Sequence, residues 1–239
     1  MSKKVFYSLI LFLSVNLLLT SCSDDDPDKI TLESSNVEVV VGEEVSIKIN
    51  SGNGGYEVTS DKAETATASL KDRTITIKGV AEGTTTLTVT DKEGEKATIS
   101  VKVVADLTPD AVGIYWGELK VKVDEVESTV PGAEIELEKI GGNKVKLVLE
   151  NFSFDQIQVG DIVVEDIKLT KDGDILKLAD TTVTKELAEG VISAKISITS
   201  SQVEGDNLIL SIGISDIKIG GEAAGFDVAV TFDGDKGLS

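Results

Sequence analysis

Residues 133–150, AEIELEKIGGNKVKLVLE, alternate apolar and charged side chains on both sides of a Gly-Gly-Asn turn. A period of two residues puts the apolar side chains on one face of a strand and the glutamates and lysines on the other. The turn at residues 141–143 favours a β-hairpin, in which glutamates opposite lysines contribute about 0.2–1 kcal/mol per pair. The segment therefore predicts two antiparallel strands that share one buried face.

The same alternation continues through residues 111–239. Residues 115–123 alternate cleanly, and further strands are expected around Ile157–Leu169, Ile175–Leu178, Val191–Ile198, Asn207–Ile219 and Phe226–Phe232. Residues 184–189 are expected to form at most one helical turn. Consecutive antiparallel strands each bury one face, and a sheet closed on itself has no exposed edge. We therefore predict an antiparallel up-and-down β-barrel over residues 111–239, with bulges at Gly160-Asp161 and Ser215-Asp216.

Side-chain alternation assigns the aromatic residues of this barrel to opposite faces. An eight-stranded barrel has an interior just wide enough for side chains or for one small molecule. The aromatic residues expected inside are Tyr115, Phe152, Phe154, Phe226 and Phe232. Trp116 falls on the polar face, where it is a candidate contact for a sugar or a protein partner, since indole is amphipathic. It can equally cap the barrel end or lie under the linker.

Residues 29–104 have the pattern of a separate, smaller β domain. Val45, Ile47 and Ile49 alternate with polar residues, and similar short runs follow, broken by Gly, Asn and Asp at intervals of about eight to twelve residues. This spacing predicts a β-sandwich. Residues 105–110 are the expected linker, because Pro109 cannot donate to a strand ladder and restricts the residue before it.

The first 28 residues have the pattern of a secreted protein. Lys3 and Lys4 precede an apolar run, Val5–Leu19, of the length that a secretory signal uses. This run is interrupted by polar residues and is shorter than the ~20 residues of a membrane span. Residues 1–21 are therefore expected to be a signal peptide. Residues 22–28 form an acidic tether that repels itself and stays extended.

The composition excludes several classes of function. The net charge is −19, so binding to nucleic acids, which depends on Lys and Arg, is disfavoured. Histidine is absent and Cys22 is the only cysteine, which removes the usual general base, a thiolate in the folded part and zinc sites built on nitrogen or sulfur. The Asp-Gly-Asp segments at residues 172–174 and 233–235 are interpreted as turns rather than as paired carboxylates of a glycosidase. We predict no catalytic residues, no metal and no cofactor.

The N-terminal segment resembles a bacterial lipoprotein signal. Leu19-Thr20-Ser21-Cys22 is similar to a lipobox, which implies that Cys22 becomes the acylated first residue and that acyl chains on Cys22 make the contact with the membrane. Ser23, Asp24, Asp25 and Asp26 resemble the surface-export signal of Bacteroidetes lipoproteins. This resemblance implies a lipid-anchored outer-membrane protein that is exposed at the cell surface.

Both folded parts also resemble known domain families. Val41-Gly42-Glu43 and residues 74–79 and 83–89 are similar to bacterial immunoglobulin-like group 2 domains. Residues 113–119, 151–154, 159–162 and 228–234 are similar to the calycin-like β-barrel domain of Bacteroidetes lipoproteins. The chain departs from true lipocalins, whose first strand carries Gly-x-Trp, because two residues separate Gly113 from Trp116. Holding a small apolar ligand is therefore an analogy.

The sequence thus predicts an all-β protein: an N-terminal Ig-like β-sandwich followed by a calycin/lipocalin-like β-barrel. The expected function is that of a non-catalytic surface protein, with the sandwich as a stalk and the barrel as a head that recognises a glycan or a surface protein. The alternative is a lipocalin-like carrier of a small apolar ligand. A hydrolase that uses Asp and Glu, and a purely structural surface protein, are further alternatives.

Overall fold

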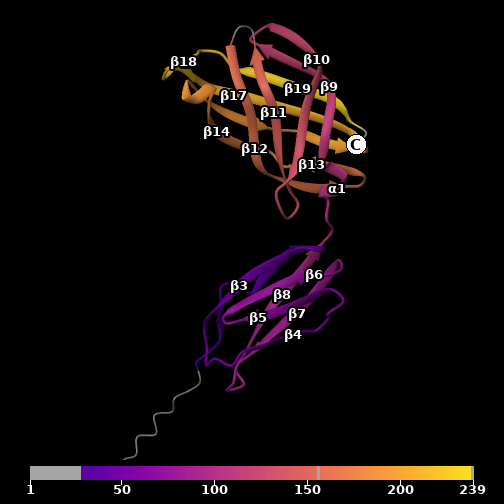
Figure 1. Cartoon of the computed structure of the whole chain (residues 1–239), viewed down its shortest axis with the longest axis vertical. Coiled ribbons are helices and arrows are strands. Elements are labelled where there is room, and N and C mark those ends of the chain that lie inside the picture. Colours follow the sequence, from indigo (N-terminus) through magenta and orange to yellow (C-terminus); the bar gives the residue numbers. More distant parts are fainter. Residues whose placement is uncertain (1–27, 155–156, 238–239) are drawn as a thin grey trace, which may run out of the picture.

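The computed structural model describes residues 28–154 and 157–237, and Figure 1 shows two all-β bodies joined end to end. The predicted signal peptide, Cys22 and the acidic run Ser23–Asp26 lie outside the described residues. No helix among the described residues is long and apolar enough to cross a membrane.

The N-terminal body consists of two four-stranded sheets that pack face to face. One sheet has the order β1-β3-β6-β5, with bounds Thr31–Leu32, Glu44–Ser51, Thr74–Gly79 and Ala66–Lys71. The other has the order β2-β8-β7-β4, with bounds Asn36–Val40, Lys96–Val104, Gly83–Thr90 and Glu57–Ser60. Strands β2 and β8 are parallel, and the other neighbours are antiparallel. Alternate apolar side chains from both sheets form one buried cluster, so the predicted β-sandwich is confirmed.

The C-terminal body is a barrel of eight antiparallel strands. A four-residue helix, α1 (Thr108–Ala111), leads into it. The ring runs β9-β10-β11-β12-β13-β16-β17-β19 and closes where β19 pairs with β9. The bounds are Gly113–Val123, Val126–Lys139, Lys144–Phe154, Ile157–Asp172, Ile175–Leu178, Ser201–Glu204, Asn207–Ile219 and Val228–Lys236. The predicted up-and-down barrel is therefore confirmed.

Three shorter strands and a 3-10 turn extend the barrel wall. Strand β14 (Thr181–Leu187) continues the course of β13 and pairs with β15 (Ile192–Ile198), which in turn pairs with β17. A 3-10 turn, η1 (Ala188–Gly190), joins β14 to β15, and β18 (Glu222–Ala223) folds back on the end of β17. The helical turn expected over residues 184–189 is therefore wrong: most of it is strand. Val183 and Leu187 mimic a helical spacing, but pairing with β15 along all seven residues of β14 determines the conformation.

Strand pairing around the ring is continuous at one end of the barrel only. The end beside the sandwich, here the proximal end, carries α1 and the β10–β11 turn (Figure 1). At the other, distal end two seams open. Pairing of β10 with β11 stops at Glu136 and Val148, and pairing of β12 with β13 is confined to the last residues of β12, Leu169–Asp172. The hairpin of β11 and β12 is consequently paired only with itself near the distal end.

Polar contacts join the sandwich to the proximal end. The ammonium Nζ of Lys139 lies 2.8 Å from Glu43 Oε1 in the sandwich and 2.8 Å from Asp106 Oδ2 in the linker. The Gly142 amide donates to Glu43 Oε2 at 2.7 Å. Asn143 accepts from the Leu107 amide and donates to the Ala105 carbonyl, each at 2.8 Å. Hydrogen bonds to Asp106 and Glu43 raise the pKa of Lys139, which therefore stays charged across the junction.

One predicted turn of the barrel is in fact a strand. Asp233-Gly234-Asp235 lies inside β19, where Gly234 pairs with Gly117 of β9. The two strands approach so closely that a Cβ at Gly117 would overlap the carbonyl oxygen of Asp233, and one at Gly234 would overlap the carbonyl oxygen of Trp116. Glycine is therefore required here by a close approach between strands, and not by a turn. The other Asp-Gly-Asp segment does form a turn, between β12 and β13.

Candidate functional site

The barrel interior is filled by its own side chains. Tyr115, Phe152, Phe154 and Phe232 are buried in one apolar cluster with the Ile, Leu and Val side chains of all eight strands. The Tyr115 hydroxyl donates to the Ala111 carbonyl at 2.6 Å, which fixes α1 against the proximal end. Among the residues expected inside, Phe226 alone is half-buried, at the distal end. There its ring meets Phe154 edge to face, with centroids 5.9 Å apart.

The outward-facing side chains of β9, β19 and β17 form an outer wall that carries Trp116. The Trp116 side chain is 50% exposed. Strand register places it in one row with Glu134 of β10, Asp235 of β19 and Asn207 of β17. The Asn207 side-chain amide donates to Asp233 Oδ1 at 2.9 Å and to Asp235 Oδ1 at 3.1 Å. We call the four residues of this row the Trp116 patch. It offers an aromatic face flanked by carboxylate and amide groups.

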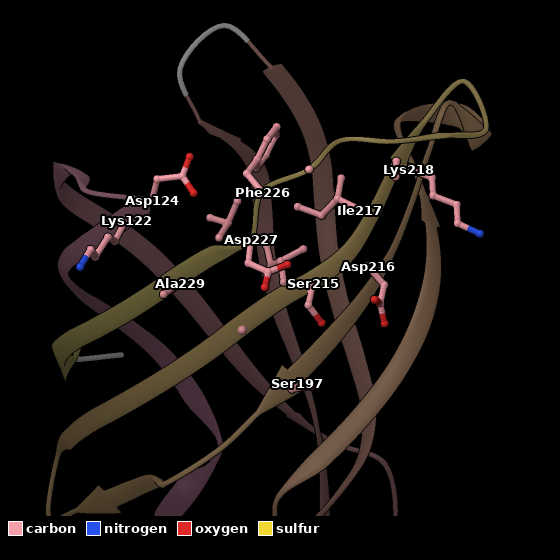
Figure 2. Close-up of a pocket in the computed structure, with 15 residues that line it drawn as sticks. Lys122, Asp124, Ser197, Ser215, Asp216, Ile217, Lys218, Phe226, Asp227 and Ala229 are labelled. Carbon is pink, nitrogen blue, oxygen red and sulfur yellow. The ribbon is translucent and has the colours of Figure 1, made fainter.

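A groove of about 940 Å³ opens at the distal end of the same outer wall (Figure 2). It exists because β17 bulges at Ser215 and Asp216, where its register with β15 shifts and Asp216 has φ +54°, while the chain returning from β18 donates a backbone hydrogen bond to Ile217. Pairing of β17 with β19 resumes at Ile214 and Val228. Between the bond at Ile217 and the pair Ile214–Val228, the two chain segments separate, and the space between them is the distal groove. The sequence predicted the bulge from its phase slip but did not predict the groove.

The distal groove has a small-residue floor and polar walls, with further apolar lining from Ile214, Ile217, Phe226 and Val228. Gly213 and Ala229 form the floor, since they face outward on neighbouring strands. Figure 2 shows Lys122 and Asp124 at one side of the groove and Lys218 at the other. The remaining polar lining consists of Ser197, Ser215, Asp216 and Asp227. The volume falls within the range of about 300–1,000 Å³ typical of small-molecule sites.

The chemistry of this lining favours hydrogen bonding. In the part of the chain that the structure describes, no group of three or more His, Cys, Asp and Glu side chains is placed to hold a metal ion. The carboxylates and hydroxyls of the groove and the two lysines at its margins instead supply acceptors and donors at the surface. This mixture suits a ligand that is rich in hydroxyl groups and that both donates and accepts.

The carboxyl groups with a shifted pKa all lie away from the groove. Hydrogen bonds from lysines lower the pKa of Glu38 and of Asp172. Burial raises the pKa of Asp91 and Asp106, but hydrogen bonds from neighbouring amides and side chains outweigh it and lower both values. A glycosidase acid needs a raised pKa, so the shifts in these four groups run in the opposite direction.

Several residues of the outer wall were missed from the sequence. The sequence pattern favours a turn at Asp233 and Asp235, although the alternation of the inward-facing Val228, Val230 and Phe232 continues through them and makes both face outward. That alternation was the available signal. Glu134 and Asn207 had no local signal, because only the pairing of four strands brings them to the row of Trp116.

Eight antiparallel strands closed around a filled apolar core define a small up-and-down barrel protein. Residues 112–235 match the model of the calycin-like beta-barrel domain, and the chain therefore belongs to that family. No curated protein matches the chain.

Among solved structures, the chain is similar to parts of the S-layer protein SbsC. A structure of its domains 4 and 5 is 35% identical over 33% of this chain and 53% of that chain, with a TM-score of 0.29. This chain thus spans about half the length of that structure. A structure of domains 5–6 is 23% identical over 85% of this chain and 96% of that chain, with a TM-score of 0.29. A Bacteroides ovatus protein of unknown function is 10% identical over 86% of this chain and 89% of that chain, with a TM-score of 0.23. These TM-scores are too low to indicate a shared overall arrangement.

Proposed function

We propose that this protein is a non-catalytic binding protein, held at the cell surface by a lipid on Cys22, whose barrel recognises a glycan or a protein through its outer wall. The sandwich acts as the stalk, and the barrel acts as the head. This proposal rests on where a ligand could fit: outside the barrel wall and not inside it. The interior is occupied by buried side chains, whereas the distal groove of about 940 Å³ lies on the outside of the wall.

A glycan is the ligand class that the outer wall fits best. Sugar rings present hydroxyl groups at their edges and an apolar C–H face, which stacks on aromatic side chains. Trp116 offers an exposed aromatic face between Glu134 and Asp235, and the distal groove offers hydroxyl and carboxylate groups. The outward-facing residues of β9 connect the two, since Trp116, Glu118, Lys120 and Lys122 alternate along one strand. An extended glycan chain lying along β9 would reach both.

The cell-surface part of the proposal rests on the N-terminal residues. Lipidation of Cys22, export directed by Ser23–Asp26, a Bacteroidetes origin and membership of the Ig-like group 2 domains are proposed from the sequence resemblances given above. The two-sheet sandwich is compatible with the last of these. Labelling cells with palmitate tests the anchor: the parent chain should be labelled, and Cys22→Ala should not. Digestion of intact cells by an added protease tests exposure.

The alternative, a carrier with an apolar ligand in the barrel, finds less support. Tyr115, Phe232, Ile135, Leu147 and Ile162 are fully buried and occupy the space such a ligand would need. Organic extraction of the purified protein followed by mass spectrometry tests it, because a carrier should release a stoichiometric apolar compound.

A glycan array probed with the mature chain and three variants tests ligand recognition. Trp116→Ala removes the aromatic face. Gly213→Phe fills the distal groove, because a Cβ at Gly213 meets no atom within 4 Å and its side chain would project into the open space. Thr184→Phe, at an exposed position of β14, is the matched control.

The proposal expects the parent and Thr184→Phe to bind the same glycans. At least one of the other two variants should lose binding by about tenfold or more, the equivalent of one stacking or hydrogen-bonding contact. Equal binding by all four proteins, or no binding by any of them, would refute recognition of glycans at this surface.

A further inference from the structure

Strand β10 is paired along most of its length on the β9 side only. Its register with β9 runs from Val126 to Leu137, whereas its register with β11 is confined to Glu136–Lys139. Within the described residues, the side of β10 that faces β11 therefore lacks a strand partner from Val126 to Ile135. Such a row of free backbone N–H and C=O groups is a template for another strand. Pro131 and the bulge at Gly132 divide this edge into two stretches, Val126–Val130 and Ala133–Ile135.

The open seam beside this edge is a cleft of about 300 Å³. Its apolar lining includes Val130, which pairs with the buried Leu119 yet is 44% exposed. On the far side of the cleft, the backbone amide of Asn151 donates to Asp161 Oδ1 at 2.8 Å and is therefore not a free donor for an incoming strand. An incoming strand would therefore bond to β10 and cover Val130, while its other edge packs against β11.

The outward-facing margins of the cleft are acidic. Glu134 and Glu136 of β10 and Glu150 of β11 line it, and none of them forms an ion pair with a described residue. Opposite charges facing each other across paired strands contribute about 0.2–1 kcal/mol per pair, and like charges oppose pairing. A second copy of β10 would bring its own Glu127, Glu134 and Glu136 to these positions. Pairing of two copies is therefore disfavoured, as it also is by the net charge of −19.

We propose that the β10 edge is a docking site for an extended segment of another protein, which adds a strand between β10 and β11 and carries Lys or Arg at its outward-facing positions and apolar residues at the alternate ones. Backbone hydrogen bonds to β10 supply affinity, and the glutamates and Val130 supply selectivity, as in other complexes formed by strand addition. The site is separate from the distal groove, shares only Glu134 with the Trp116 patch, and requires neither a glycan nor a lipid anchor.

The probe is a capped synthetic peptide in which Lys and Val alternate five times, titrated against the mature full-length chain by calorimetry. A second peptide of the same sequence carries an N-methyl group on every backbone amide, which removes strand pairing at both edges but keeps every charge. A third peptide replaces each Lys by Glu. The test variant is Glu134→Lys/Glu150→Lys. The matched control is Glu204→Lys/Glu222→Lys, which alters the net charge equally at exposed sites remote from the cleft.

The proposal expects the Lys peptide to bind the parent and the control variant equally within about twofold, and the test variant at least about tenfold more weakly. The Glu peptide should bind only the test variant. N-methylation should abolish binding. Equal binding of the N-methylated peptide would show attraction of charge alone and overturn the proposal. Absence of binding by the Lys peptide would overturn it too, as would a dimer of the free chain that the Glu134→Lys/Glu150→Lys change disperses.

Discussion

The two ends of the barrel are made from the same eight strands but differ in how completely those strands are paired. At the proximal end the ring is continuous, α1 is fixed by Tyr115, and Glu43 of the sandwich bonds to the β10–β11 turn. At the distal end β10 parts from β11, and the end of β17 parts from the segment that leads into β19. Both the groove and the acidic cleft lie where pairing stops. The closed end therefore holds the barrel against the sandwich, whereas the open end leaves the two cavities to which we assign binding.

Truncation of a core side chain should give the largest difference in unfolding free energy between the two ends. Leu147 is fully buried near the proximal end, so Leu147→Ala should lower the free energy of unfolding by about 2–5 kcal/mol. Phe226→Ala, at the half-buried distal position, should cost less than half as much. Urea unfolding followed by fluorescence measures both, because Trp116 is the only tryptophan and reports on the barrel. Equal losses would mean that the distal end contributes as much as the proximal end.

Alkaline pH should weaken the proximal end through Tyr115. Burial, and secondarily the charge of Asp206, raise the pKa of Tyr115 to about 12. The unfolded chain loses this proton near pH 10, before the folded chain does, so the contribution to stability is complete below pH 10 and is lost as pH rises towards 12. Between these values the parent should lose about 1–3 kcal/mol more than Tyr115→Phe does. Parallel stability profiles for the two proteins would contradict this assignment.

At neutral pH, Tyr115→Phe should lower the free energy of unfolding by about 0.5–1.5 kcal/mol, because the Tyr115 hydroxyl makes a buried hydrogen bond to Ala111. Tyr56→Phe in the sandwich is the matched control, since the buried Tyr56 hydroxyl has no hydrogen-bond partner among the described residues. Tyr56→Phe should leave the unfolding free energy of the sandwich unchanged or slightly raised. Calorimetry distinguishes the two substitutions, and a larger loss for Tyr56→Phe would reverse the comparison.

The smallest expected effect on stability concerns the junction. Glu43→Ala removes the contacts to Lys139 and Gly142, and the partial exposure of the ion pair limits the loss to less than about 1 kcal/mol. The motion of the two bodies should nevertheless change. Nuclear magnetic resonance relaxation should give one tumbling time for the parent and for the neighbouring control Glu44→Ala, and two times for Glu43→Ala. A single time for all three would show that the junction does not depend on Glu43.

Much of this architecture could be predicted from alternation alone. The hairpin around residues 141–143, the closed antiparallel barrel and the outward position of Trp116 follow from period-two patterning, because each strand buries one face. The membership of the ring does not, since the expected strand Val191–Ile198 lies outside it as β15 and β16 stands in its place. The misassigned segment Asp233–Asp235 shows where local rules fail, since the close approach of Gly117 to Gly234 is a property of two strands distant in sequence. For the same reason, Trp116 is the one residue of the Trp116 patch that the sequence predicts. The seams had no sequence signal, because they depend on where pairing ends.

Amide hydrogen exchange of the full-length chain tests most directly whether the ring is closed at one end only. Every second amide of β10 between Val126 and Glu134 should exchange rapidly, because it faces the open cleft. The alternate amides, bonded to β9, and those of Leu137–Lys139 that are bonded to β11 should be strongly protected. Uniform protection along β10 would contradict the account, since it would mean that β11 pairs with β10 along its whole length and that no edge is free.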